Sequence, residues 1–450
     1  MCRTIQMDLF GEERTWVNGR IEMAEHTLKC LGCAKEYEDD HFRLDCDEKH
    51  EPSLLRTVYP KRTLDLQIDN PGMFKFYDWL PVERVIGSKG APVTYKSEGL
   101  ARHLGLKNLH VIFNGFWPEK GAYMETASFK ELEAPSVLAR VPDGHDETIV
   151  VASAGNTGRA FAHVCSQNRI PLVLVVPEGS IEDIWSPEPF SENVKLVVAA
   201  GRSDYYDAIH LAGKITQLDG FFPEGGAKNV ARRDGMATTV LDAAMTIGRI
   251  PDHYFQAIGS GTGGIAAWES RLRLLEDGGY GNAKMSLHLS QNHPFVPMYD
   301  AWKNGSREIP AMDEEDAKNR IRMVKAKVLS NRKPPFGLKG GVFDVLQASG
   351  GAMYSVNNRD LDAVLELFER LEGIDICPAA GVAVSSLFQA VAGGSVRKDD
   401  CIVVNITGGG EKRVKKEYNV NYLEPFLRIY DTEIRSDTLD RKLERMMAVV

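Results

Sequence analysis

Short runs of apolar, β-branched residues alternate along most of the chain with stretches in which apolar residues recur every three or four positions. The runs that predict strands lie within residues 147–156, 171–177, 194–200, 253–260 and 401–407. Helical spacing is found in residues 158–167, 205–217 and 232–248. Nearly continuous apolar strands that alternate with helices are typical of parallel sheets covered on both faces. The pattern therefore predicts an α/β fold from about residue 147 onward.

Composition narrows the class of protein. The chain has 450 residues, enough for about two or three domains. Its net charge of -9 argues against a broad surface for nucleic acid or anionic membrane. No apolar run has the roughly 18 residues that a membrane span needs, and the first residues lack the apolar core of a secretory signal. With seven cysteines and no such signal, we expect reduced thiols and a cytoplasmic location.

Residues 26–50 are rich in cysteine and resemble a small zinc ribbon. Cys30 and Cys33 form a CxxC knuckle, and Cys46 with His50 would complete the four ligands of a tetrahedral zinc site. The second half is irregular, however, because it offers Cys-x3-His in place of a second CxxC. A degenerate ribbon that packs without metal is an equally good interpretation, so no metal is counted among the predicted site residues.

Three loops follow predicted strands and carry small or polar residues. The loop 153–158, SAGNTG, comes just before a predicted helix, where free backbone amides favour an anion. A plain strand-to-helix turn capped by Ser or Asn is the equally good alternative. The loop 259–264, GSGTGG, also opens a helix and matches the dinucleotide pattern G-x-G-x-x-G. Gln291 stands where a dinucleotide site needs an acid, so a monophosphate fits this loop better. The third loop, 407–410, begins with Thr407, which alone often only caps a strand.

Taken together with Lys130, which follows small residues in the stretch TASFKE, these loops indicate a particular cofactor. A lysine, an asparagine in a donor-rich loop, a monophosphate cradle and a hydroxyl at a strand end together suit pyridoxal phosphate. Lys130 would form the Schiff base, Asn156 would hydrogen-bond the phenolic O3′, and Thr407 would face the pyridine nitrogen. A hydroxyl in place of Asp leaves that nitrogen largely unprotonated, which favours elimination and replacement at Cβ. The alternative for Lys130 alone is a solvated surface lysine.

Four motifs resemble the fold type II pyridoxal phosphate enzymes, and threonine synthases in particular. The motifs are SFK around Lys130, SAGNTG, GSGTGG, and EGIDICPAAGVAV at 372–384. The similarity as a whole covers about residues 26–415. The chain departs from threonine synthases around the site, reading METASFKELEA at 124–134 and TGGGEKR at 407–413. The stretches around Lys130, SAGNTGRAFA and FPEGGAKNVARRDGM look most like the cysteate synthase family.

The resemblance implies a reaction and a set of residues. Cysteate synthases make L-cysteate from O-phospho-L-serine and sulfite for coenzyme M synthesis; a threonine synthase or another phospho-amino-acid lyase is the alternative. Lys130 would be the catalytic base, and Arg232 the cation for the substrate phosphate, with Arg159 a weaker candidate. The remaining implied contacts are Ser153 and Thr157 for the substrate, and Gly259, Ser260, Gly261, Thr262 and Gly263 for the cofactor phosphate.

The same resemblance implies two α/β domains, as in tryptophan synthase β, behind the small ribbon. We expect an extension at 1–25, a ribbon-like segment at 26–60, a large cofactor domain from 61–132 and 246–450, and a small mobile domain at 133–245. A homo-oligomer is also expected. Two other classes stay open: an inactive interaction protein that uses the ribbon, and a nicotinamide enzyme.

Overall fold

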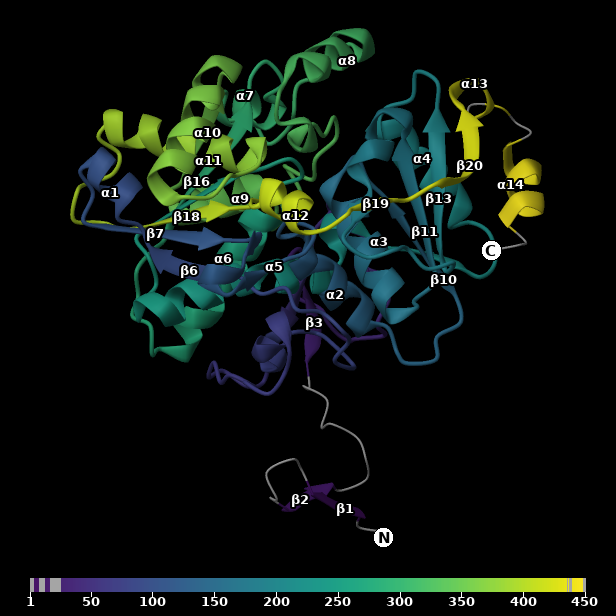
Figure 1. The fold of residues 1–450 in the computed structure, drawn as a ribbon, viewed down its shortest axis with the longest axis horizontal. Coiled ribbons are helices and arrows are strands. Elements are labelled where there is room, and N and C mark those ends of the chain that lie inside the picture. Colours follow the sequence, from purple (N-terminus) through teal and green to yellow (C-terminus); the bar gives the residue numbers. More distant parts are fainter. Residues whose placement is uncertain (1–3, 8–12, 17–25, 435, 437–438, 448–450) are drawn as a thin grey trace.

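Two parallel β-sheets form the two halves of the protein (Figure 1). The structure is a computed structural model, and it describes the chain except for residues 1–3, 8–12, 17–25, 435, 437–438 and 448–450. The α/β class and the two main sheets predicted from the sequence are confirmed. No helix in the described part of the chain is long and apolar enough to cross a membrane.

The larger sheet has six strands in the order β17-β16-β15-β18-β7-β6, parallel except where β6 runs against β7. Its strands are β6 (Val93–Lys96), β7 (Asn108–Phe113), β15 (His253–Ala257), β16 (Ser286–Asn292), β17 (Ala352–Val356) and β18 (Cys401–Ile406). Consecutive side chains on a strand point to opposite faces. Tyr254 accordingly packs with one hydrophobic cluster and Phe255 with another.

Helices cover both faces of this sheet. One cluster joins it to α1 (Gly99–Leu104), α10 (Asn358–Glu372) and α11 (Pro378–Ala392). The other cluster joins it to α5 (Val230–Ile247), α6 (Thr262–Asp277) and α9 (Val342–Ser349). Burial on both faces explains why the strand sequences are nearly continuous apolar runs.

The smaller sheet has five parallel strands in the order β14-β10-β11-β13-β20. They are β10 (Thr148–Ala152), β11 (Leu172–Pro177), β13 (Val194–Ala200), β14 (Phe221–Pro223) and β20 (Pro425–Tyr430). One face packs on α2 (Lys130–Arg140) and α3 (Asn156–Asn168). The other packs on α4 (Tyr205–Ile215), α13 (Asp431–Ile434) and α14 (Leu439–Met447).

The C-terminal segment crosses from one half to the other. It passes from β18 through α12 (Glu411–Glu417) and β19 (Asn421–Tyr422) to β20, drawn in yellow in Figure 1. β19 pairs with β12 (Trp185–Ser186), and β20 pairs with β13. The smaller sheet thus includes residues beyond the range 133–245. The predicted division into a large domain and a small mobile one stays a prediction.

A three-stranded antiparallel sheet precedes both halves, in the order β4-β3-β5. Its strands are β3 (Thr27–Cys30), β4 (Glu36–Glu38) and β5 (Leu55–Val58), which agrees with the expected ribbon-like segment. Within the predicted irregular extension, β1 (Thr4–Met7) pairs antiparallel with β2 (Glu13–Trp16), so these residues are strands. The other short elements are β8 (Phe116–Trp117), β9 (Ala122–Tyr123), α7 (Pro297–Lys303) and α8 (Glu314–Met323).

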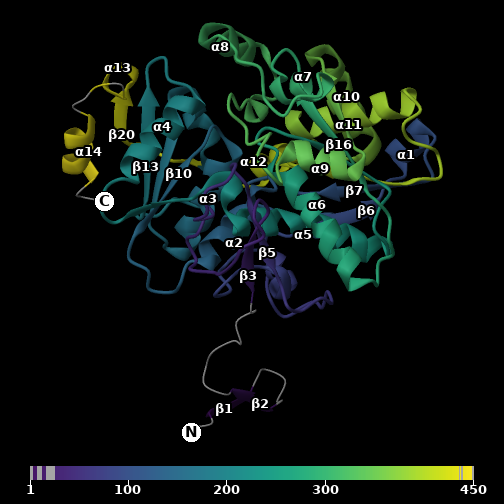
Figure 2. The same ribbon diagram turned by 180° about the vertical axis from the view of Figure 1, so that it is seen from behind.

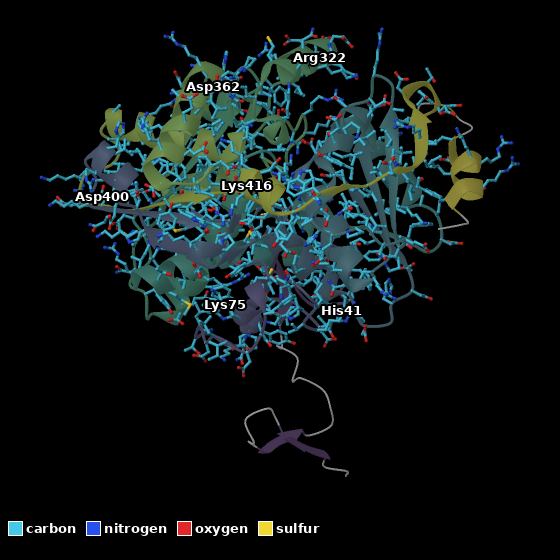
Figure 3. The ribbon with its side chains drawn as sticks, in the orientation of Figure 1. His41, Lys75, Arg322, Asp362, Asp400 and Lys416 are labelled. Atoms are coloured by element: carbon cyan, nitrogen blue, oxygen red, sulfur yellow. The ribbon has the colours of Figure 1, made fainter. Side chains whose placement is uncertain are left out.

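Charged side chains lie mostly on the outside of these layers. Arg322 on α8, Asp362 on α10 and Lys416 on α12 are exposed, and Figure 3 shows their side chains on the outer surface. Charges that are buried in spite of this trend need partners, because an unpaired charge in the interior is costly. The buried charged side chains of α2 and α5 are therefore candidates for a functional site.

α2 and α5 approach each other very closely, and a glycine makes this possible. A Cβ atom built on Gly235 of α5 would lie 2.0 Å from the carbonyl oxygen of Leu132 on α2. Each helix carries a cation in its first turn: Lys130 is the first residue of α2, and Arg232 is the third residue of α5. The glycine contact thus sets the distance between these two side chains.

We predict that Gly235→Ala destabilises the protein by about 1–3 kcal/mol, the range for overpacking a tight interior. Gly213→Ala, at an exposed position of α4, is the matched control, because a Cβ there meets nothing within 4 Å. The control should be neutral or stabilising by about 0.5–1 kcal/mol. Urea unfolding of both variants measures the difference. Equal midpoints for the two would contradict a close helix contact at Gly235.

Candidate active site

A cavity of about 490 Å³ lies where strands of both sheets end at their carboxyl ends. In α/β proteins this edge is where ligands bind. The loops after β10, β15 and β18 contribute residues of the three predicted stretches, namely 153–157, 259–263 and Thr407. Lys130, residues 225–232 and residues 328–338 complete most of the wall. The predicted site residues therefore line one cavity, except for Arg159, the weaker candidate for the substrate phosphate.

Lys130 is the first residue of α2 and lines the cavity. Its side chain is 17% exposed, and its Nζ donates a hydrogen bond of 2.9 Å to Oε2 of Glu133, one turn along the helix. The ammonium also lies over the Phe129 ring, 4.8 Å from the centroid. Burial lowers the pKa of Lys130, and the Glu133 carboxylate only partly opposes this shift. A buried lysine with a lowered pKa has the reactivity of a nucleophile or base.

Glu133 is fully buried and shared between two cations. Its Oε2 also accepts a hydrogen bond of 3.1 Å from Nε of Arg232 on α5. Burial acts to raise the pKa of Glu133, but the charges of Arg232 and Lys130 outweigh it, so the pKa lies below its usual value. Glu133 thus stays ionised and ties the first turn of α2 to the first turn of α5.

Arg232 has a second buried carboxylate partner. Its Nη1 donates to Oε2 of Glu224 at 2.8 Å, and its Nη2 donates to Oγ1 of Thr157 at 3.3 Å. Burial acts to lower the pKa of Arg232, but Glu133 and Glu224 raise it. All three nitrogens of the guanidinium are therefore directed by the protein. The predicted phosphate-binding arginine lies in the cavity wall, joined to the loop that carries Asn156.

Asn156 is oriented by Arg159. Arg159 Nη2 donates a 2.7 Å hydrogen bond to Oδ1 of Asn156, and its guanidinium stacks over Trp185 at 4.3 Å from the ring centroid. Because Oδ1 accepts from an arginine, the amide nitrogen of Asn156 is the group left to donate to a ligand. Arg159 is buried behind Asn156 and is not among the described residues that line the cavity. The geometry gives it the role of holding Asn156.

Ser153 shapes its own loop. Its Oγ accepts hydrogen bonds from the backbone nitrogens of Gly155 at 3.2 Å and Gly158 at 2.7 Å. Gly155 has a φ of 145°, a conformation that side chains rarely allow. Ser153 thus makes the local turn that one interpretation of this loop predicted, and the loop also lines the cavity. Its role in holding an anion stays a prediction.

The loop 259–264 joins β15 to the N-terminus of α6, a helix of 16 residues. Unpaired amides and the helix dipole favour a phosphate there. Gly261 has a φ of 86°, and a Cβ on it would lie 2.1 Å from Val342. Only glycine fits this position, so the backbone stays open to the cavity. Ser260 Oγ and Thr262 Oγ1, 2.8 Å apart, place two hydroxyls at the same helix start.

Thr407 follows β18 and is 4% exposed in the cavity wall. Its carbonyl oxygen accepts a 3.1 Å hydrogen bond from the backbone nitrogen of Phe129, next to Lys130. The strand end and the start of α2 are thus fixed to each other. Nearby, Cys377 caps the first turn of α11, where its Sγ accepts a hydrogen bond from the backbone nitrogen of Ala380 at 3.5 Å.

Sequence reasoning missed both carboxylates of the network. Glu133 stands three residues after Lys130, at the i+3 spacing that lets side chains on a helix meet, so the sequence offered a signal for it. Glu224 gave no such signal, because its partner Arg232 lies on the following helix and the contact depends on the turn at 225–226. Lys228 and Lys333 also line the cavity and were not predicted.

The residues of this site fit pyridoxal phosphate. An amine with a lowered pKa, an amide with its nitrogen left to donate, a glycine loop at a helix start and a hydroxyl at a strand end surround one cavity. When bound, the cofactor would supply an electron sink for the proton at the substrate Cα. Lys130 would hold it, with Asn156, the loop 259–263 and Thr407 around the ring and phosphate.

We predict that Glu133→Gln shifts the pH dependence of cofactor loading to lower pH. The Glu133 carboxylate favours the charged form of Lys130, so its loss lowers the pKa of Lys130 further and frees the amine at lower pH. The measurement is the rate at which the cofactor-free protein regains its visible absorbance, as a function of pH. Glu131→Gln is the control, because Glu131 is buried on the same helix but bonds to Thr126. A midpoint that is unchanged or higher in Glu133→Gln would contradict the pairing.

Comparison with known proteins agrees with this geometry. Residues 96–408 match the family described as pyridoxal-phosphate dependent enzyme. Cysteate synthase of Methanosarcina acetivorans is 48% identical over 418 residues, which cover 93% of this chain and 100% of the relative. Cysteate synthase of Methanocella arvoryzae is 51% identical over 410 residues, which cover 90% of this chain and 96% of the relative.

Solved structures share the fold at much lower identity. Maize serine racemase superimposes with a TM-score of 0.54 at 11% identity, over 72% of this chain and 91% of that chain. The processed form of threonine deaminase isoform 2 from Solanum lycopersicum gives a TM-score of 0.53 at 14% identity, over 72% of this chain and 86% of that chain. This likeness supports fold type II. With the site, the family match and the close relatives together, the chain belongs to the cysteate synthase family of pyridoxal-phosphate dependent enzymes.

Proposed function

We propose that this chain converts O-phospho-L-serine and sulfite into L-cysteate and phosphate, as a pyridoxal phosphate-dependent β-replacement enzyme in coenzyme M biosynthesis. The proposal rests on family membership and on the charge of the cavity. The cytoplasmic location and the homo-oligomer expected from the sequence are part of the same proposal.

The charge of the cavity wall is the observation that carries this proposal. Among the described residues that line it, the charged ones are all cations: Lys130, Lys228, Arg232 and Lys333. No carboxylate of the described residues lines the cavity, since Glu133 and Glu224 lie behind Arg232. Both proposed substrates are anions, and so is the cofactor phosphate. A cleft with one sign of charge raises the local concentration of ligands with the opposite charge.

Lys130 is the group proposed to move the proton at the substrate Cα. Burial lowers the pKa of Lys130, so the neutral form, which can accept a proton, is easier to reach than for an exposed lysine. Glu133, at 2.9 Å from Nζ, is placed to stabilise the ammonium that results. The phosphate then leaves Cβ, sulfite sulfur bonds to Cβ, and Lys130 returns its proton to Cα. The balance is one phosphate released for each sulfite taken up.

Arg232 is the proposed cation for the phosphate of phosphoserine. Its Nε and Nη1 are held by Glu133 and Glu224, so the guanidinium is fixed before a ligand arrives. Its Nη2 points toward Thr157, on the loop that is proposed to hold the substrate carboxylate with Ser153. A fixed cation loses less entropy on binding than a mobile one. The two buried carboxylates thus serve to orient Arg232.

The alternative reaction, that of a threonine synthase, uses water as its nucleophile in place of sulfite. Threonine formation from homoserine phosphate needs water to add and a further proton to move at Cβ, whereas the proposed reaction needs only the Cα proton and an anion. The added methylene of homoserine phosphate would itself change affinity by only about 1–3 kcal/mol. We therefore expect discrimination to come mainly from the chemistry and some leakage toward related phospho-amino acids.

The decisive assay incubates the holoenzyme with O-phospho-L-serine and sulfite and measures phosphate and L-cysteate. We predict equal amounts of the two products, and neither in the absence of phosphoserine. Efficient threonine formation from homoserine phosphate, with no cysteate from phosphoserine, would overturn the proposal in favour of a threonine synthase.

Arg232→Lys tests the role of the arginine while keeping its charge. We predict a KM for phosphoserine at least tenfold higher, with cofactor occupancy unchanged. Lysine lacks the planar guanidinium that can contact Glu133, Glu224 and the substrate phosphate at the same time. Arg273→Lys is the control, because Arg273 is also buried and pairs with Asp234 at 2.5 Å outside the cavity. An equal rise of KM in both variants, or a parallel loss of cofactor from Arg232→Lys, would move Arg232 out of the substrate site.

A further inference from the structure

The N-terminal ribbon gathers four metal-ligating side chains at one point. One ligand atom each from Cys30, Cys33, Cys46 and His50 lies within 4.8 Å of the others. Cys30 ends β3, Cys33 follows in the turn, and the other two lie in the irregular segment before β5. Residues 20 positions apart in the chain therefore meet, although the second half of the motif lacks the usual spacing.

The distances match a tetrahedral zinc ion. With Zn–S of 2.3 Å and Zn–N of 2.0–2.1 Å, two sulfurs lie about 3.8 Å apart and a sulfur and a nitrogen about 3.6 Å apart. Sγ of Cys33 and Sγ of Cys46 are 3.6 Å apart, and Sγ of Cys30 is 3.3 Å from Nε2 of His50. These two pairs thus lie close to the separations that the ion requires, and all four ligand atoms are within 4.8 Å of one another. A disulfide would need sulfurs at about 2.05 Å.

The histidine is oriented as in a metal site. Nδ1 of His50 lies 2.6 Å from the carbonyl oxygen of Glu51, so the proton is on Nδ1 and Nε2 is free for a ligand bond. Metal-binding histidines commonly use the second nitrogen in this way. A Cβ on Gly32 would lie 2.9 Å from the His50 ring, so glycine in the knuckle leaves room for that ring.

Donors surround the sulfurs of Cys30 and Cys46. The backbone nitrogen of Gly32 donates to Cys30 Sγ at 3.3 Å, and Ser53 Oγ lies 3.1 Å from the same sulfur. The backbone nitrogen of Glu48 donates to Cys46 Sγ at 3.4 Å, and Tyr37 OH lies 3.0 Å from it. Hydrogen bonds of this kind stabilise a thiolate, which is the form that binds zinc.

From these contacts we propose that Cys30, Cys33, Cys46 and His50 bind one zinc ion in a closed, structural site. This goes beyond the sequence pattern, which left a metal-free ribbon equally open, and it does not depend on the proposed reaction. Four protein ligands leave no position for a substrate, and thiolate-rich tetrahedral sites select zinc.

The position of the ribbon gives the zinc a role in the fold. Figure 2 shows β3 and β5 lying over α5, and Leu28, Cys30 and Leu55 pack with Val230 at the start of that helix. Asp45, next to the ligand Cys46, pairs with Lys228 of the cavity wall at 2.7 Å. Zinc would therefore fix the ribbon against the helix that carries Arg232.

Elemental analysis of the purified holoenzyme tests the proposal. We predict about one zinc per chain in the wild type, at least a fivefold loss in Cys33→Ser and Cys46→Ser, and no loss in Cys401→Ala. Cys401 is the control because it is a buried cysteine on β18, far along the chain from the ribbon. Absence of metal from the wild type, a Cys33–Cys46 disulfide found by mass spectrometry, or full zinc in the double Cys33→Ser/Cys46→Ser variant would overturn it.

A second measurement on the wild type covers the case in which the variants fail to fold. Protein produced with cobalt in place of zinc should show the intense visible bands of a tetrahedral thiolate site, at longer wavelengths than the cofactor absorbs. Octahedral, weakly absorbing cobalt would overturn the ligand set. A zinc that is structural should also raise the melting temperature when present; removal by a chelator that leaves the melting temperature unchanged would overturn that role.

Discussion

The site depends on one buried chain of charges, in which Lys130, Glu133, Arg232 and Glu224 alternate in sign. Two carboxylates and two cations are almost removed from water, with hydrogen bonds between 2.8 and 3.1 Å along the chain. Removing one member of a buried pair typically costs about 3–5 kcal/mol, because its partner is left uncompensated. The network therefore fixes Lys130, the proposed base, and Arg232, the proposed phosphate ligand, as a unit, and it makes both sensitive to the same substitutions.

The rest of the fold serves to hold that chain of charges in place. The close contact at Gly235 joins the two helices that carry it. The loops at 153–158 and 259–264 are brought to it from two different sheets, because each follows the carboxyl end of a parallel strand. Arg159 orients Asn156 from behind, and the ribbon packs on the start of α5. Activity thus depends on parts of the chain that never touch the substrate.

The sequence predicted the local parts of this arrangement better than the contacts between them. The strands that became β10, β11, β13, β15 and β18 were confirmed because burial on both faces makes them continuous apolar runs. Lys130, Asn156 and Thr407 were predicted as site residues because each follows a recognisable local pattern. Glu224 and the crossing of β20 to the smaller sheet depend on pairings between distant residues, which no local spacing encodes. The same reason left the proposed zinc ligands undecided, since only the folded chain brings His50 to Cys30.

The central claim is that Lys130, rather than another cation of the cavity, is the amine that binds the cofactor. Reduction of the holoenzyme with borohydride would fix the cofactor to its lysine, and mass spectrometry of the digested protein would locate it. The account predicts that the cofactor is found on the peptide that contains Lys130. Labelling at Lys228 or Lys333, the other lysines of the cavity wall, would contradict it.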